Sequence, residues 1–189
     1  MRVFVAGPRA VGSLNKNVTD VLARIIEKKL TVLLGDAAGV DRLVQKYFSD
    51  ANYPDVFVYA SNGKPRNNLG EWPICKVEVP DNVRGFNFYA QKDIKMAKDA
   101  DYGFMIWNGK SKGTLNNIIN LVNQNKKVVI YLIPIKRIIC IDKLESVKKM
   151  VDFLGPVALS LYEELCPQNT FGNASEDSFE QMSLSDIFG

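Results

Sequence analysis

The residues best suited to chemistry lie in a segment of small and acidic residues, Gly-Asp-Ala-Ala-Gly-Val-Asp-Arg, at positions 35–42. An apolar stretch precedes it at residues 30–34, and an amphipathic stretch follows at residues 40–48. A turn of small residues between a strand and a helix lets a ligand approach backbone N–H groups, and the positive end of the helix dipole faces that ligand. The pattern predicts a phosphate-binding loop.

A second segment has the same design. Residues 107–114, Trp-Asn-Gly-Lys-Ser-Lys-Gly-Thr, follow the apolar residues 102–107 and precede another predicted helix. Arg9, Lys64 and Arg66 add positive charge near strand ends, and an arginine binds phosphate through two hydrogen bonds. The two loops together indicate a site for a phosphate or diphosphate. Trp107 is interpreted either as a surface on which a base or sugar stacks or as a half-buried structural residue.

The chain has no histidine, which excludes a Ser-His-Asp triad and histidine-containing zinc sites. Cys75, Cys140 and Cys166 have no metal-ligand spacing, so we predict no metal and no tightly bound cofactor, in a reducing, cytoplasmic setting. Acid–base chemistry must then use other groups. Asp36, inside the first loop, is the first choice for a catalytic carboxylate, and Asp41 is the second. Asp41 has an alternative, purely structural interpretation, in which its negative charge in the first turn interacts favourably with the helix dipole.

The charge of the chain is distributed unevenly. Residues 1–149 contain 24 basic and 14 acidic residues, whereas residues 150–189 contain seven acidic residues and no basic one. A basic body favours partners that carry phosphate, such as nucleotides or nucleic acid, or serves only solubility. No apolar run approaches the ~20 residues of a membrane helix, so no membrane partner is expected. A homo-oligomer is left open.

Predicted strands and helices alternate along residues 1–166. Short apolar stretches predict strands at residues 2–6, 30–34, 55–60, 102–107, 127–133 and 137–141. Helices are expected at residues 17–28, 41–49, 86–98, 114–123, 143–153 and 156–165. This order predicts an α/β, Rossmann-like, doubly wound and mainly parallel sheet with helices on both faces, followed by an acidic tail at residues 167–189.

The order of the motifs resembles the YspA-type branch of the SLOG superfamily, whose Rossmann-like domains are related to the LOG-type phosphoribohydrolases. The similar motifs are Gly-x-Arg at residue 7, Gly-x-Ala-x-Gly-x-Asp-Arg at residue 35, Gly-Lys-Pro-x-Asn at residue 63, and Ser-x-Gly-Thr at residue 111. The resemblance covers residues 1–135, and residues 136–166 would add a strand and helices. It implies a nucleotide or nucleotide-sugar ligand. By position, the resemblance implies a site lined by Gly7, Arg9, Gly35, Ala37, Gly39, Asp41, Arg66, Asn67, Ser111, Gly113 and Thr114. Lys64 and Trp107 are added to this set for their charge and their aromatic ring.

Some relatives of this kind cleave or transfer N-glycosidic bonds, and the LOG-type enzymes use a glutamate that follows their Gly-Thr motif. This chain has Asn117 at that position, and an asparagine is neither nucleophile nor base. Two functions therefore remain open. One is an enzyme that transfers a glycosyl group or cleaves an N-glycosidic bond, acting on nucleotides or on phage DNA. The other is a non-catalytic sensor or sponge for a nucleotide-derived ligand.

The last nine residues, Gln-Met-Ser-Leu-Ser-Asp-Ile-Phe-Gly, resemble the sliding-clamp-binding peptides of T-even phages. Gln181, Leu184, Ile187 and Phe188 have the spacing of anchors for a hydrophobic pocket on the clamp. This implies a phage protein in the host cytoplasm that is recruited to replicating DNA. The alternatives are that the apolar end packs back on its own domain, or that the acidic tail covers the basic body and regulates it.

Overall fold

In a computed structural model, which describes residues 1–167, 183 and 186–188, the chain forms a seven-stranded sheet with the order β4-β3-β2-β1-β5-β6-β7. The strands are β1 (Arg2–Ala6), β2 (Thr31–Leu34), β3 (Val56–Ser61), β4 (Ile74–Val77), β5 (Tyr102–Trp107), β6 (Val128–Leu132) and β7 (Arg137–Ile141). Neighbouring strands are parallel, except that β6 and β7 are antiparallel. The predicted α/β, Rossmann-like fold with a mainly parallel sheet is confirmed.

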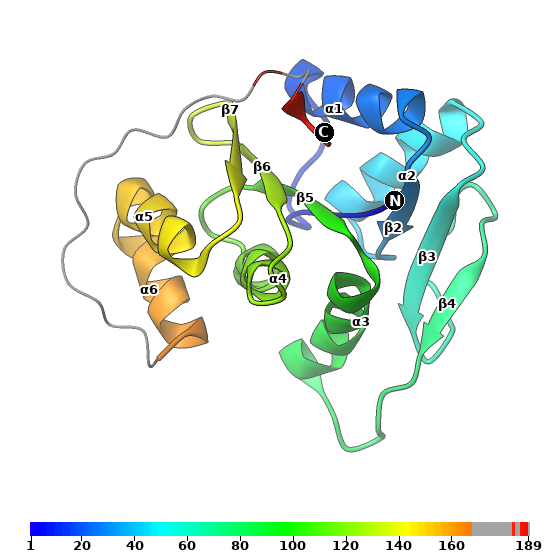
Figure 1. Ribbon diagram of the computed structural model, residues 1–189. Coiled ribbons are helices and arrows are strands. Elements are labelled where there is room, and N and C mark those ends of the chain that lie inside the picture. The colour runs from blue at the N-terminus through cyan, green and yellow to red at the C-terminus, as the bar shows by residue number, and fades with distance from the viewer. Residues whose placement is uncertain (168–182, 184–185, 189) are drawn as a thin grey trace.

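Helices cover both faces of the sheet (Figure 1). They are α1 (Lys16–Glu27), α2 (Val40–Asp50), α3 (Gly85–Asp99), α4 (Lys112–Val122), α5 (Leu144–Leu154) and α6 (Pro156–Leu165). Apolar side chains of α1 and α2 pack on one face, and those of α3, α4, α5 and α6 pack on the other. None of the helices among the described residues is both long and apolar enough to cross a membrane.

Each central strand contributes to both hydrophobic cores because successive side chains of a strand point to opposite faces. In β1, Val3 and Val5 belong to the core under α1 and α2, whereas Phe4 and Ala6 belong to the core under α3 and α4. This two-sided burial explains why the strands are continuous apolar runs in the sequence.

The edge strand β4 is absent from our sequence-based prediction. Its residues, Ile-Cys-Lys-Val, are half-buried or exposed, and Ile74 is 46% exposed. An edge strand has one neighbour, here β3, and needs little apolar content, so its hydrophobic pattern is weak.

The strand order places β1 beside β5, and these neighbours lead to helices on opposite faces of the sheet. Such a switch point leaves a crevice at the carboxyl ends of the two strands. Because β1, β2 and β5 are parallel, the segments that follow them meet at one edge of the sheet, as predicted for both glycine loops.

The C-terminal residues Ile187 and Phe188 lie against the α1 face of the sheet (Figure 1). Ile187 is 0% exposed and Phe188 is 3% exposed. The Phe188 ring meets the Tyr102 ring edge-on at 6.0 Å, and Lys28 Nζ donates to the Phe188 carbonyl at 3.4 Å. Ile187 and Phe188 therefore pack against their own domain, which is one of the alternatives that the sequence left open. Gln181 and Leu184, the other two predicted clamp anchors, lie outside the described residues.

This packing predicts that Phe188→Ala destabilises the domain by about 2 kcal/mol, because the substitution removes most of a buried aromatic side chain. Urea denaturation of the full chain measures the effect. Phe153→Ala is the matched control, since Phe153 is 61% exposed and its loss should change the free energy of unfolding by less than about 0.5 kcal/mol. Equal stability of Phe188→Ala and the unchanged protein would contradict the packing of the C-terminal residues.

Candidate functional site

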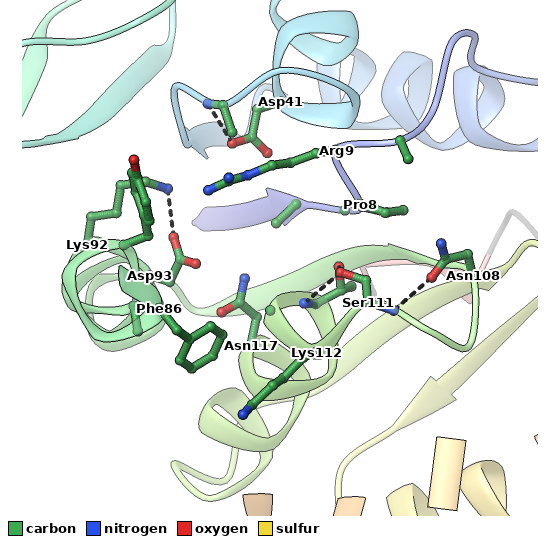
Figure 2. Close-up of a pocket in the computed structure, with 18 of the residues that line it drawn as sticks. Pro8, Arg9, Asp41, Phe86, Lys92, Asp93, Asn108, Ser111, Lys112 and Asn117 are labelled. Atoms are coloured by element: carbon green, nitrogen blue, oxygen red, sulfur yellow. Dashed lines mark hydrogen bonds and ion pairs between the residues drawn. The ribbon is translucent and has the colours of Figure 1, made fainter. Parts of the chain in front are cut away.

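A pocket of about 520 Å³ lies at the switch point between β1 and β5 (Figure 2). Its walls come from the segment after β1, from the β2–α2 loop, from α3, and from the loop and first turns of α4. The volume lies within the range of small-molecule sites, which is roughly 300–1,000 Å³. Both predicted glycine loops reach this pocket, but they do so in different ways.

The loop between β5 and α4 is held in shape by its own polar side chains. Gly109 has a φ of +74°, which favours glycine, and the Asn108 side-chain oxygen accepts hydrogen bonds from the N–H groups of Lys110 and Ser111. Ser111 is the N-cap of α4 and accepts from the Thr114 N–H. Trp107 is fully buried, and its Nε1 donates to the Ser111 carbonyl at 3.1 Å. Trp107 therefore braces the loop and does not line the pocket.

The first turn of α4 faces the pocket with backbone donors. The N–H groups of Lys112 and Gly113 have no acceptor inside the helix, and within the described residues no side chain or carbonyl accepts from them. A Cβ atom on Gly113 would meet no atom within 4 Å, so space is left beside this turn. The helix dipole adds partial positive charge at the same point, which suits an anion.

The residues that line the pocket include the cationic side chains of Arg9, Lys110 and Lys112. Arg9 and Lys110 line the pocket, and in the described part of the chain neither forms an ion pair with a carboxylate. Lys112 is paired with Glu164 of α6 at 2.5 Å and lies 5.0 Å from the centre of the Phe86 ring. Of these three side chains, Arg9 and Lys110 therefore carry a positive charge that no carboxylate of the described residues neutralises, and this charge can bind an anion.

The loop between β2 and α2 is closed by protein atoms. Gly39 has a φ of +74°, and its missing side chain leaves room for the backbone of Arg9. The Val40 N–H donates to the Pro8 carbonyl at 3.2 Å, and the Ala37 N–H donates to Asp41 Oδ2 at 3.1 Å. The small residues here permit contact between two chain segments, in contrast to the close approach of a ligand that the sequence suggested.

Asp36 and Arg66 form an ion pair beside this loop. The guanidinium donates to both oxygens of Asp36, at 3.0 and 2.7 Å, and the Arg66 backbone N–H donates to the same carboxylate. Burial acts to raise the pKa of Asp36, but the hydrogen bonds and charge of Arg66, with the charge of Lys92, outweigh burial, so this pKa lies below its ordinary value. Asn67 Nδ2 donates to the Asp36 carbonyl. These contacts engage Arg66 and Asn67 in fixing the loop.

Helix α3 contributes a buried charge cluster that the sequence analysis missed. Lys92 is 4% exposed, and its Nζ lies 2.7 Å from Asp93 Oδ1 and 4.0 Å from Asp36 Oδ1. Burial acts to lower the pKa of Lys92, but the charges of Asp93, Asp41 and Asp36 outweigh it and raise this pKa. For Asp41, burial is the largest effect and raises its pKa to about 6, even though Lys92 and the Ala37 N–H act in the opposite direction. Figure 2 shows Asp41 and Asp93 at the same end of the pocket.

Tyr89 of α3 also lines the pocket. It is 36% exposed, and the guanidinium carbons of Arg9 and Arg66 each lie 4.8 Å from the centre of its ring. Contacts of this kind between a cation and an aromatic ring hold an arginine side chain in place. Tyr89 thereby orients Arg9 at the pocket.

The structure brings together half of the predicted site residues. Those that line the pocket are Gly7, Arg9, Ala37, Asp41, Ser111, Gly113 and Thr114. Those that lie outside its lining are Gly35, Asp36, Gly39, Lys64, Arg66, Asn67 and Trp107. Among the described residues, no group of three or more acidic or cysteine side chains is arranged to hold a metal ion.

Comparison with known protein families and with curated proteins finds no match to this chain. The resemblance to the SLOG superfamily therefore rests on the sequence motifs alone.

The burial of Asp41 makes a prediction about pH. Its pKa is about 6 in the folded protein against an ordinary value of 3.8, so the native state binds more protons than the unfolded state between these values. The contribution of Asp41 to the free energy of unfolding is therefore full below about pH 4 and is lost as the pH rises through 6. The Asp41→Asn variant has no carboxyl group at this position, so its stability relative to the unchanged protein should rise by about 2.5 kcal/mol between pH 4 and pH 7.

Urea denaturation at pH 4, 5.5 and 7 measures this difference. Asp81→Asn is the control, because Asp81 is exposed and the stability of that variant should follow the unchanged protein at every pH. A difference between Asp41→Asn and the unchanged protein that does not vary with pH would show that Asp41 is not the buried carboxyl described here.

Proposed function

We propose that this protein binds a nucleotide or nucleotide sugar, with its phosphate at the first turn of α4. The observation that carries this proposal is the pair of N–H groups on Lys112 and Gly113, which have no acceptor among the described residues and belong to residues that line a pocket of about 520 Å³. Arg9 and Lys110 also line the pocket, and neither is ion-paired with a carboxylate in the part of the chain that the structure describes. Backbone donors, a helix dipole and an arginine are the groups that bind phosphate in proteins.

The far end of the pocket suits the rest of such a ligand. Tyr89 lines the pocket, and the Arg9 guanidinium lies 4.8 Å from the centre of its ring, so a base would stack on this planar guanidinium beside the ring. Asp41 and Asp93 are carboxyl groups that accept hydrogen bonds from ligand hydroxyls. Arg66 has no part in this proposal, because Asp36 already binds its guanidinium.

Binding is tested by calorimetry with nucleoside mono- and diphosphates and with nucleotide sugars. Arg9→Ala should weaken binding about tenfold or more, since it removes a charge-assisted hydrogen bond to phosphate. Arg137→Ala makes the same change of charge on β7, at an exposed residue outside the pocket, and should leave affinity unchanged. Equal affinities of all three proteins would rule out Arg9 as a phosphate ligand, and no binding of any compound would rule out the proposal.

The carboxyl groups favour a second function, cleavage or transfer of a glycosidic bond. Asp41 has a pKa of about 6, chiefly through burial, and an acid of this strength donates a proton near neutral pH. Asp93 is ion-paired with Lys92 and lies at the same end of the pocket. In such a reaction Asp41 protonates the leaving group as the bond to the anomeric carbon breaks, and Asp93 stabilises positive charge on the sugar. Water or an acceptor hydroxyl then bonds to that carbon and returns a proton to Asp41.

Incubation with nucleotides, nucleotide sugars and DNA, followed by mass spectrometry of the products, tests this activity. Asp93→Asn should lower the rate at least about 100-fold, because the neutral amide stabilises positive charge poorly, while ligand binding persists. Asp81→Asn is again the exposed control. Binding without any product would identify the protein as a sensor or sponge, the alternative that Asn117 suggests.

Recruitment to a sliding clamp and a DNA acceptor form a separate proposal. It is supported by the spacing of the apolar residues at 184, 187 and 188 in an acidic segment. Because Ile187 and Phe188 are buried in the domain, recruitment requires these side chains to leave the α1 face first.

A further inference from the structure

Asn117 of α4 is a buried amide with an unpaired oxygen. The residue is 3% exposed and lines the pocket, and within the described residues its Oδ1 has no hydrogen-bond partner. Buried polar atoms in folded proteins nearly always have partners, because an unpaired one costs free energy. The binding of a ligand would remove this cost.

The position of Asn117 relates it to the proposed phosphate site. Gly113 and Asn117 are four residues apart on one helix, so they share a face and lie about 6 Å apart along the helix axis. Figure 2 shows the Asn117 side chain extending from α4 into the space between Asp93 and Ser111. Rotation about χ2 of an asparagine is broad and roughly two-fold, so either end of the amide can face that space.

We infer that Asn117 is a specificity-determining residue whose amide binds a hydroxyl group of the ligand, about one helical turn from the phosphate. A hydroxyl both donates and accepts hydrogen bonds, so it pairs with the amide oxygen and also matches the amide nitrogen. The ligand class is then a phosphorylated sugar or polyol with a free hydroxyl about 6 Å from its phosphorus. The inference rests on the proposed function, because it takes the first turn of α4 as the phosphate site.

Two probes separate the phosphate from the hydroxyl. Inorganic phosphate occupies the first turn of α4 alone, and ribose 5-phosphate adds sugar hydroxyls at the required distance. Titrations of the isotope-labelled full chain, followed by NMR at constant ionic strength, give the two dissociation constants. The unchanged protein should bind ribose 5-phosphate more tightly than phosphate. Asn117→Leu should bind phosphate as before and lose about three- to tenfold of the affinity for ribose 5-phosphate.

Stability provides a second readout. A structural role for Asn117 predicts that Asn117→Leu unfolds more easily, whereas removal of an unpaired buried oxygen should leave the melting temperature equal or higher. Asn120→Leu is the matched control: Asn120 lies on the same helix and its Nδ2 is also unpaired and buried, but it does not line the pocket. That variant should bind both probes as the unchanged protein does. Asn117→Ala serves as a smaller replacement if leucine prevents folding.

The outcomes distinguish this inference from the proposed function. If neither probe saturates the unchanged protein, the phosphate site is wrong and the inference fails with it. If phosphate binds but ribose 5-phosphate has no advantage, or keeps its advantage in Asn117→Leu, the role of Asn117 is overturned and the phosphate site stands. An equal loss of both probes in Asn117→Leu also overturns the hydroxyl contact, because Asn117 would then act on the phosphate.

Discussion

The ammonium group of Lys92 is the charge on which the arrangement of the pocket depends. A buried ammonium is tolerated when carboxylates surround it, and Lys92 has Asp93 on its own helix and Asp36 and Asp41 from the β2–α2 region. Asp36 in turn binds Arg66. This network joins α3, the β2–α2 loop and the segment before β4, which are far apart in the chain. One wall of the pocket is therefore held by charge, whereas the sheet below it is held by apolar packing.

The sequence predicts the parts of this structure that local patterns determine. Strands such as β1 and β5 are buried on both faces, so each is a continuous apolar run with bounds that can be read directly. Lys92 gives no such signal, because a lysine on an amphipathic helix is ordinarily solvated. Its burial depends on Asp36 and Asp41, which lie more than 50 residues earlier. The contribution of α3 to the pocket thus follows from tertiary contacts that the sequence pattern does not contain.

The two glycine loops also depend on tertiary contacts that the sequence pattern does not contain. Both have small residues between a strand and a helix, and the sequence predicts that both expose backbone N–H groups to a ligand. In the first, the Pro8 carbonyl accepts a hydrogen bond from the Val40 N–H, and the Asp41 carboxylate accepts one from the Ala37 N–H. Gln45 Nε2 donates to the Gly35 carbonyl. In the second, the side chains of Asn108 and Ser111 accept hydrogen bonds from N–H groups of the loop and of Thr114, but the first two N–H groups of α4 have no acceptor within the described part of the chain. Whether such a loop binds a ligand depends on which distant groups reach it.

For Ile187 and Phe188, packing on their own domain competes with binding to a partner. An apolar side chain that fits a partner's pocket also fits a groove on its own domain, and the same transfer from water stabilises both arrangements. Burial of Ile187 and Phe188 contributes on the order of 1.5 to 3 kcal/mol each before the ordering of the segment is subtracted. Every 1.4 kcal/mol of net docking on the domain lowers the apparent affinity for an external partner about tenfold. A partner that binds these residues must therefore exceed the α1 face in affinity, or bind at several sites at once so that avidity compensates.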